Sequence, residues 1–287
     1  MMRSFAVGLM GLLAAGPARA ANEYLVPFPA HHIIANIYYV GSKGQANYLI
    51  TTPKGNILIN SGLEGNVPMI KDSVAKLGFK YSDTKVLLIS HAHFDHDAGS
   101  AQVVKDTGAT YEVMDADVPT VESGGKKDFA YGDKGPDMLY PPVKVGRVLH
   151  DGDTVSLGGT VLTAHKTPGH TRGCTTWTLK VQDGGKTLDV AIVGSPNVNP
   201  GYVLVGNKTY PQIVQDYEQT FKVLKALPVD VFLGAHGDYY GMDTKYPRLK
   251  DGAANPFIDP AGYKAYIANR EAAYRKELAR QQAAAKP

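Results

Sequence analysis

Three histidines and an aspartate are concentrated in the six residues from His91 to His96. Imidazoles and carboxylates are common zinc ligands in proteins. Residues two apart in an extended segment point to the same side, so His91 and His93 can hold one metal ion. Asp95 and His96 then turn toward a second ion. The alternative is a solvated histidine-rich loop, but an aspartate between histidines at a strand-to-helix turn favours two neighbouring metals.

Two further histidines follow later predicted strands, and each has a glycine beside it. Gly169 precedes His170 and Gly237 follows His236, which lets the backbone approach a crowded site closely. With these two, the chain has six candidate ligands, which divide into two groups of three. Three protein ligands leave one position on each zinc open for water, as in catalytic zinc sites. The groups are His91, His93, His170 and Asp95, His96, His236. The remaining histidines are expected to be surface or core residues: His31, His32, His150 and His165.

Buried strands must bring these residues to one place. The run 85–90 is short, apolar and rich in β-branched residues, and it predicts a strand that delivers His91 at its C-terminal end. That edge of an α/β sheet is where ligands bind. The other predicted strands are 33–40, 46–51 and 56–60, which form an antiparallel meander, and 111–114, 154–157, 160–165, 174–180, 188–193 and 229–233. The predicted helices are 67–77, 98–107, 210–227 and 262–282.

The predicted elements form two similar β-rich halves, each with helices. Two sheets packed face to face with helices outside would bury every apolar face. The apolar side of the last helix is expected to pack against the domain and not against a partner. Between the halves, the glycine-rich span 122–142 predicts a long loop, and its aromatic Phe129, Tyr131 and Tyr140 favour a lid over a pocket.

The N-terminal segment has the features of a secretory signal peptide. It has a charged start at Arg3, an apolar run from 5 to 15 and small residues at Ala18 and Ala20, which predicts cleavage after Ala20. The run is too short for a span of about 20 apolar residues. The mature chain, 21–287, is therefore expected to be a soluble exported domain without a membrane span.

The balance of charge and the cysteine content exclude two further possibilities. Removing Arg3 and Arg19 leaves 28 of the 30 basic residues against 27 acidic ones, so the formal charge falls from +3 to +1. That charge does not favour a nucleic-acid partner. Cys174 is the only cysteine, so the chain cannot form an internal disulfide. The strand pattern around it indicates a buried structural residue, in preference to a nucleophile or a zinc ligand.

The HxHxDH motif at 91–96, with the glycine-flanked His170 and His236, resembles the metallo-β-lactamase superfamily over essentially the whole mature chain. The resemblance implies an α/β fold, namely a four-layer αβ/βα sandwich of two facing mixed β-sheets with outer helices. It also implies two zinc ions per chain at the edge between the sheets. The superfamily includes thioesterases, lactonases, nucleases and oxygen-dependent enzymes, so the fold leaves the substrate open.

Ser195, after the strand 188–193, narrows the resemblance. At this position the glyoxalase and lactonase branches have a Gly-Asp pair, whose aspartate bridges both metals. Two of the three β-lactamase subclasses have a cysteine there that binds the second zinc. Serine does neither well, so the pattern resembles the third subclass of class B β-lactamases, as do the segments 195–202 and 167–173. Two positions depart from relatives: Asn60 stands where much of the superfamily has an aspartate, and Val229 where several subclass members have a disulfide cysteine.

The resemblance implies hydrolysis of the β-lactam amide of penicillins, cephalosporins and carbapenems, and hence antibiotic resistance, by a metal-bound hydroxide that Asp95 orients. Ser195 and Asn197 would hydrogen-bond the substrate carboxylate, and Tyr202 would lie near the carbonyl. The predicted export is consistent with this activity, because β-lactams act in the periplasm. The expected protein is a periplasmic monomer with a small-molecule substrate. The alternatives are an exported metallo-hydrolase of another lactone, ester or thioester, and a zinc-binding non-enzyme, which the complete ligand set disfavours.

Overall fold

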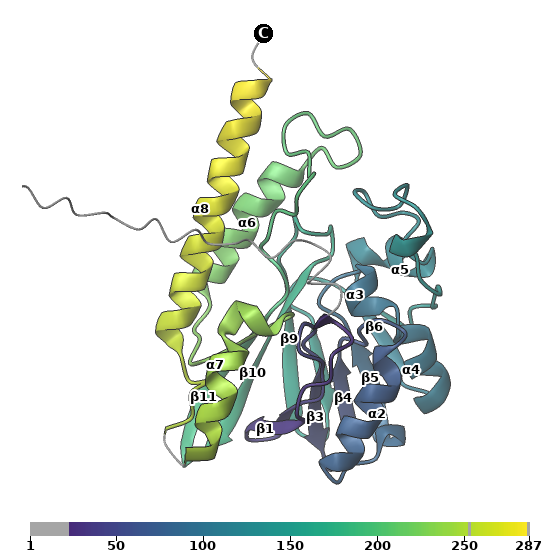
Figure 1. Cartoon of the computed structure of the whole chain (residues 1–287), viewed down its shortest axis with the longest axis vertical. Coiled ribbons are helices and arrows are strands. Elements are labelled where there is room, and N and C mark those ends of the chain that lie inside the picture. The colour runs from purple at the N-terminus through teal and green to yellow at the C-terminus, as the bar shows by residue number, and fades with distance from the viewer. Residues whose placement is uncertain (1–22, 252–253, 286–287) are drawn as a thin grey trace, which may run out of the picture.

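Two β-sheets face each other, and helices cover their outer sides (Figure 1). The computed structural model describes residues 23–251 and 254–285, so the predicted signal peptide lies outside the described residues. Within these ranges, no helix has the length and apolar character needed to cross a membrane. The layered arrangement confirms the predicted fold class, in which each sheet buries one face against the other and one against helices.

The first sheet has seven strands in chain order, antiparallel from β1 to β4 and parallel from β4 to β7. The strands are β1 His31–Ile34, β2 Ile37–Tyr39, β3 Tyr48–Thr52, β4 Gly55–Ile59, β5 Thr84–Leu88, β6 Thr110–Met114 and β7 Arg147–Leu149. Helices α2 (Asn66–Lys76) and α4 (Ser100–Thr107) connect the parallel strands. The C-terminal ends of β4, β5 and β6 therefore meet at one edge.

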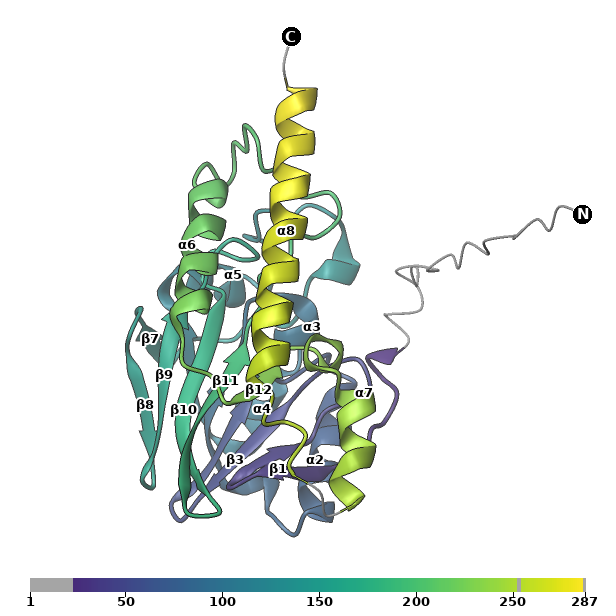
Figure 2. The ribbon, with the colours of Figure 1, turned by 90° about the vertical axis from the view of Figure 1, so that its left-hand side faces the viewer.

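The second sheet has the order β12-β11-β10-β9-β8, and only β11 and β12 are parallel. Its strands are β8 Thr154–Leu157, β9 Thr160–Lys166, β10 Thr175–Asp183, β11 Lys186–Val193 and β12 Val231–Gly234. Helices α6 (Ile213–Ala226) and α8 (Pro260–Ala284) lie side by side on its outer face (Figure 2). The shorter helices are α3 Phe94–Asp97, α5 Val118–Glu122 and α7 Met242–Lys245, and the 3-10 turns are η1 Tyr81–Asp83, η2 Asp115–Asp117, η3 Pro136–Met138, η4 Gly237–Tyr240 and η5 Tyr246–Asp251.

The two sheets are joined by hydrogen bonds next to the histidine motif. The indole Nε1 of Trp177 in β10 donates to the carbonyl of Ile89 at 3.1 Å, and the amide of Thr175 donates to the carbonyl of Ser90 at 2.8 Å. Trp177 is buried in the core between the sheets. The segment that leads into the motif is therefore held by both sheets at once.

The structure differs from the predicted elements in a few places. The predicted strand 33–40 is the hairpin β1–β2, because Ala35 adopts a φ of 49° and reverses the chain. The predicted helix 98–107 starts at Ser100, because the separate turn of α3 precedes it. Strand β7 was not predicted. The last helix has its buried residues Tyr263 and Ile267 against the domain, as expected.

Candidate metal centre

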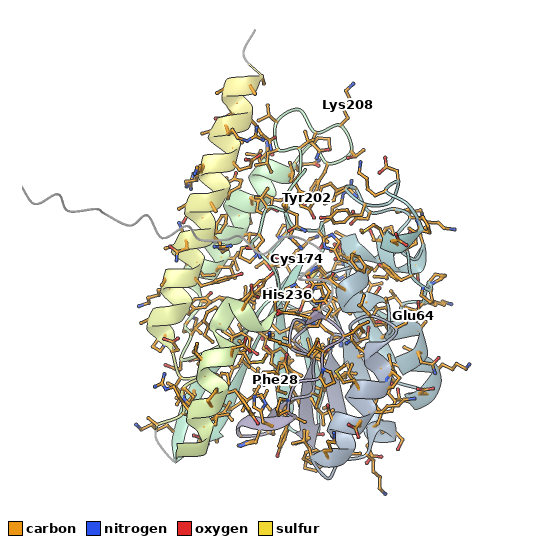
Figure 3. The ribbon with its side chains drawn as sticks, viewed as in Figure 1. Phe28, Glu64, Cys174, Tyr202, Lys208 and His236 are labelled. Atoms are coloured by element: carbon orange, nitrogen blue, oxygen red, sulfur yellow. The ribbon has the colours of Figure 1, made fainter. Side chains whose placement is uncertain are left out.

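The six predicted ligands meet where strands of both sheets end. His91 and His93 follow β5, and Asp95 and His96 lie in α3 directly after them. His170 lies in the turn between β9 and β10, and His236 follows β12. In Figure 3, His236 and Cys174 lie in the middle of the molecule near the strand ends, with Tyr202 on the loop beyond them. The pairings of the second sheet place the turns at His170 and His236 at one edge, and the hydrogen bonds of Trp177 and Thr175 hold the end of β5 beside it.

The side chains form two adjoining groups. Ligand atoms of His91, His93 and His170 all lie within 4.8 Å of one another. In the other group, the Nε2 atoms of His96 and His236 are 3.1 Å apart, and Oδ2 of Asp95 lies 3.4 and 3.7 Å from them. His91 connects the groups, because its ligand atom also lies within 4.8 Å of those of Asp95 and His96. The structure thus brings together the six residues that the sequence predicts as ligands.

Burial keeps three of the predicted histidine ligands, from both groups, in the neutral form. It lowers the pKa of His91 and His170 well below the usual value, and the surrounding imidazoles lower it further. Burial also lowers the pKa of His96 to about 3, although the charge of Asp95 opposes the shift. These rings are therefore neutral at physiological pH, which is the form that binds a metal.

In Asp95 and His93, neighbouring groups outweigh the effect of burial on the pKa. Burial disfavours the Asp95 carboxylate, but His96, His236 and His93 outweigh it and lower the pKa of Asp95 to about 2. Burial likewise disfavours a charged His93, but the hydrogen bond and charge of Asp128 raise the pKa of His93. Asp95 is therefore an ionised carboxylate among imidazoles, which gives the second group a negative charge for a cation.

Polar contacts of the outer nitrogens orient three of the rings, two of them through hydrogen bonds. Nδ1 of His170 donates to the carbonyl of Asn197 at 2.8 Å, and Nδ1 of His236 donates to the carbonyl of Gly44 at 3.0 Å. Nε2 of His93 lies 3.6 Å from Oδ2 of Asp128. Because a carbonyl only accepts, Nε2 of His170 and of His236 carries the free electron pair. Metal-binding histidines have this second partner, so the donor set fits zinc.

Three supporting residues were not predicted from the sequence. Gln45 donates its Nε2 to Oδ2 of Asp95 at 2.8 Å. Asp117 accepts hydrogen bonds from the amides of Ala92 and Gly173 and from the hydroxyl of Thr171, so it ties the turn at His91 to the turn at His170. Asp128 belongs to the predicted lid loop, which is the only signal that pointed to it. Gln45 and Asp117 had no signal in the sequence, because their contacts form only on folding.

The three predicted substrate-binding residues lie on the loop after β11. Ser195 is only 1% exposed, and its Oγ lies 3.1 Å from the hydroxyl of Tyr239. Asn197 donates its side-chain Nδ2 to that same hydroxyl at 2.8 Å. Tyr202 is buried, and its hydroxyl donates to the carbonyl of His170 at 2.8 Å. The structure thus brings all three beside the histidine groups and binds each to a neighbouring protein group.

Aromatic side chains surround the two groups. The ring of Phe129 packs against Tyr202, with centroids 5.1 Å apart, and the ring of Tyr131 packs against His93 at 5.0 Å. Both come from the predicted lid loop. Tyr24, near the N-terminal end of the described chain, lies 5.9 Å from His236 by ring centroids. The loop therefore packs against His93 of the first group and against Tyr202 beside it.

Asn60, which the resemblance placed where an aspartate is common, binds the segment before the motif. Its Oδ1 accepts from the amide of Ser90 at 2.7 Å, and its Nδ2 donates to the hydroxyl of Ser90 at 3.0 Å and to the carbonyl of Ala46 at 3.1 Å. Its backbone has a φ of 65°, a conformation that asparagine tolerates better than most residues. An amide thus performs the anchoring that a carboxylate could only partly reproduce.

Cys174 is a buried structural residue, as predicted. Its Sγ accepts a hydrogen bond from the amide of Ser195 at 3.2 Å. Burial raises the pKa of its thiol to about 12. A thiol with that pKa is neither a nucleophile nor a thiolate ligand at physiological pH.

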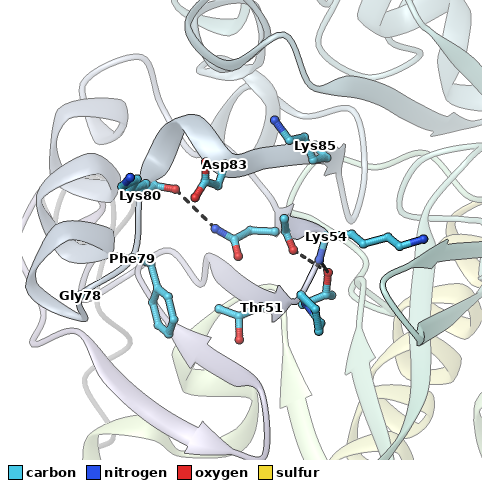
Figure 4. Close-up of a pocket in the computed structure, with 11 residues that line it drawn as sticks. Thr51, Lys54, Gly78, Phe79, Lys80, Asp83 and Lys85 are labelled. Atoms are coloured by element: carbon cyan, nitrogen blue, oxygen red, sulfur yellow. Dashed lines mark hydrogen bonds between the residues drawn. The ribbon is translucent and has the colours of Figure 1, made fainter.

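A separate cavity of about 730 Å³ lies at the opposite edge of the first sheet (Figure 4). Its lining includes Phe79, Lys80, Asp83 and Lys85, which precede or begin β5, whereas His91 follows that strand. None of the six predicted ligands lines it. The candidate metal centre is therefore distinct from this cavity.

Comparison with known proteins agrees with the geometry. The family model described as the metallo-beta-lactamase superfamily matches residues 41–236. The native FEZ-1 metallo-β-lactamase from Legionella gormanii is 55% identical, with a TM-score of 0.88, and the match covers 90% of this chain and 98% of that one. BJP-1, a subclass B3 metallo-β-lactamase of Bradyrhizobium japonicum, is 43% identical, with a TM-score of 0.87 and coverages of 93% and 100%.

Curated relatives are more distant and are described less specifically. A UPF0173 metal-dependent hydrolase of Anaeromyxobacter dehalogenans is 28% identical over 221 residues, which is 74% of this chain and 69% of that protein. A UPF0173 metal-dependent hydrolase of Rubrobacter xylanophilus is 40% identical over 68 residues, and this match spans only 26% of that protein. These relatives indicate metal-dependent hydrolysis and leave the substrate open.

Proposed function

The chain belongs to the metallo-β-lactamase superfamily, and we propose that it hydrolyses the amide bond of β-lactams, including penicillins, cephalosporins and carbapenems. The observation that carries the proposal is the position of Ser195. Its hydroxyl lies beside Tyr239, so this position adds no carboxylate or thiolate to the second group. Asp95, His96 and His236 then form that group alone, the pattern of the third β-lactamase subclass.

We propose that His91, His93 and His170 hold one zinc ion and that Asp95, His96 and His236 hold a second. When bound, two zinc ions supply an activated water and two Lewis acids, one for the lactam carbonyl and one for the amide nitrogen. Each group offers three protein atoms, so each ion keeps a position for water or substrate. No side chain has to act as the nucleophile.

Asp95 is placed to hold and orient the attacking water. Its pKa of about 2 keeps it ionised at physiological pH, so it accepts hydrogen bonds and donates none. Gln45 fixes the carboxylate by donating to Oδ2 at 2.8 Å. Asp95 also ligates in this proposal, which makes it a weak base, and its main contribution is orientation of the water.

The residues around the two groups supply binding and exclusion of bulk water. Ser195, Asn197 and the hydroxyl of Tyr239 form a hydrogen-bonded set to receive the carboxylate of the substrate. Tyr202 lies beside His93 and His170, and we place it near the lactam carbonyl. Tyr131, from the loop above His93, shields this side from bulk water.

We infer that residues 1–20 are an export signal and that 21–287 form the mature periplasmic enzyme, where it would confer resistance to β-lactams. β-Lactams act in the periplasm, which supports this location. All six predicted ligands come from a single chain, so the site needs no residue of a second copy, and we propose a monomer. Intact-mass measurement of protein from a periplasmic fraction tests the cleavage site, and a mass that still includes residues 1–20 would contradict it.

The second candidate is a metallo-hydrolase of the same fold that acts on a lactone, ester or thioester. The curated relatives are consistent with this activity, because they are described only as metal-dependent hydrolases. The test offers zinc-loaded mature protein a carbapenem, a cephalosporin, an acyl-homoserine lactone and a thioester, each with and without a chelator. We expect chelator-sensitive cleavage of the β-lactams. Cleavage of the lactone or thioester alone would establish the alternative.

A further inference from the structure

Arg270 occupies an unusual place on α8. Tyr263, Ile267 and Tyr274 form the buried stripe of this helix, and Arg270 lies on the same stripe, seven residues after Tyr263. Its Nε is buried and has no hydrogen-bond partner among the described residues. A guanidinium therefore stands where the pattern calls for an apolar side chain.

No carboxylate of the described residues lies within ion-pair distance of Arg270, in contrast to its neighbours on the helix. Arg275 pairs with Glu218 and Glu271, and Arg280 pairs with Glu277. A half-buried cation without an acid costs free energy, because the desolvation of the charge is not offset. The position of Arg270 therefore calls for a reason other than stability.

The hydrogen-bond partner of Arg270 is the side chain of Asn197. Its Nη1 lies 3.4 Å from Oδ1 of Asn197, and its guanidinium also lies over the ring of Tyr266. A guanidinium only donates hydrogen bonds, so it can bind only the oxygen end of the amide. The nitrogen end of Asn197 then faces the hydroxyl of Tyr239, to which it donates at 2.8 Å. Arg270 thereby fixes which end of the amide points which way.

The nitrogen end lies on the side of the metal centre. The hydroxyl of Tyr239 is 3.1 Å from Oγ of Ser195, and its ring centroid is 5.1 Å from that of His236. The 2.8 Å bond to Tyr239 does not by itself decide which end of the amide faces that hydroxyl, because a hydroxyl can accept or donate. A cavity of about 430 Å³ also adjoins Asn197 and Arg270. Without Arg270 the amide could turn its oxygen toward the substrate.

We propose that Arg270 is a positioning residue for an anionic group of the substrate. It holds the amide of Asn197 with its N–H groups toward Ser195 and Tyr239, where a substrate carboxylate would accept hydrogen bonds. A turned amide would present an oxygen to that carboxylate and repel it. The inference rests on the proposed function, since it concerns recognition of the carboxylate of a β-lactam.

The backbone of Asn197 does not depend on Arg270. Its carbonyl accepts hydrogen bonds from Nδ1 of His170 at 2.8 Å and from the hydroxyl of Tyr217 at 2.7 Å. Loss of Arg270 should therefore disturb the side-chain amide and leave the support of His170 in place. Zinc content is expected to stay the same in a variant at this position, which separates a positioning role from a general structural one.

The test compares a cephalosporin with a free carboxylate and its methyl ester, using the wild type, Arg270→Ala, Arg270→Lys and the control Arg280→Ala. For the acid, Arg270→Ala should raise KM by about tenfold or more, the effect of losing one hydrogen bond to a charged group, with kcat within about twofold. For the ester, KM should not change. Arg270→Lys should recover part of the loss, and Arg280→Ala should match the wild type.

Three other outcomes of this comparison would contradict the role of Arg270. An equal rise in KM for acid and ester, or no rise for the acid, would overturn the role of Arg270 while leaving the proposed function intact. A fall in zinc content in Arg270→Ala would also overturn it, because the effect would then be structural. If the wild type cleaves neither compound, the proposed function fails, and the inference fails with it.

Discussion

The Nε2 atoms of His96 and His236 lie 3.1 Å apart, although 140 residues separate them in the chain. Nδ1 of His236 donates to the carbonyl of Gly44, so its Nε2 carries an electron pair. Oδ2 of Asp95 lies 3.4 Å from one of these nitrogens and 3.7 Å from the other. Three electron-pair donors from α3 and the end of β12 thus converge on one point, which is an arrangement that a bound cation stabilises.

Replacing His236 should therefore remove one metal and spare the other. In His236→Ala we expect bound zinc to fall from about two ions per chain to about one, because His91, His93 and His170 remain as a three-ligand site. Elemental analysis of protein dialysed against zinc measures this. His150→Ala is the control, since that histidine is exposed and far from the motif in the sequence. Two zinc ions retained in His236→Ala would remove this histidine from the ligand set.

Asp128 should tune the first zinc site through His93. Its carboxylate is buried and lies 3.6 Å from Nε2 of His93, so it orients the ring and makes it more basic. In Asp128→Ala, zinc affinity of the first site should fall about 10- to 100-fold, the usual effect of losing such a partner. Competition with a chromophoric chelator measures it. Asp133→Ala on the same loop is the control, because Asp133 is 87% exposed, and equal affinities in the two variants would contradict the role of Asp128.

Asn60 should contribute to stability through both its backbone and its side chain. Asn60→Gly keeps the φ of 65° and loses the hydrogen bonds to Ser90, which we expect to cost about 1–3 kcal/mol. Asn60→Ala should cost about 0.5–1 kcal/mol more, the left-handed strain of alanine less the chain entropy of glycine. Urea unfolding followed by the fluorescence of Trp177, the single tryptophan, measures both. An alanine variant as stable as the glycine variant would show that the backbone is not strained.

Cys174 should be unreactive in the folded protein. Burial raises the pKa of its thiol from 9.0 to about 12, so at pH 8 almost no thiolate forms, whereas the unfolded chain has an ordinary thiol. Because the folded-state pKa is the higher one, this contribution to stability is complete below pH 9 and is lost as the pH rises toward 12. Labelling with a chromogenic disulfide reagent at pH 8 should be absent in buffer and stoichiometric in denaturant. Rapid labelling of folded protein would contradict the burial.

The elements that carry the metal centre were predictable because their signals are local. The runs 85–90 and 229–233 are continuous apolar segments that end at histidines, and buried parallel strands have that pattern. They correspond to β5 and β12. The grouping of six ligands followed from residue type and from strand ends that share an edge. The two β-rich halves predicted facing sheets with outer helices, and the resemblance to a known family added the four-layer αβ/βα sandwich.

The surroundings of the centre could not be predicted, because they form only when distant segments meet. Gln45 contacts Asp95 across 50 residues, and Asp117 joins two turns that lie apart in the sequence. The sequence pattern also gives no signal for the turn at Ala35, since alanine rarely takes a positive φ. The contact of Arg270 with Asn197 likewise joins segments 73 residues apart and has no local signal.

β-Lactam hydrolysis, followed as zinc is added back to the metal-free mature protein, tests the two-zinc site most directly. The two groups of three ligands predict that cleavage of a carbapenem is absent without zinc and rises until about two ions are bound per chain. The same samples give bound zinc by native mass spectrometry. Full activity at one ion per chain, or no β-lactam cleavage at any zinc content, would contradict a two-zinc β-lactamase.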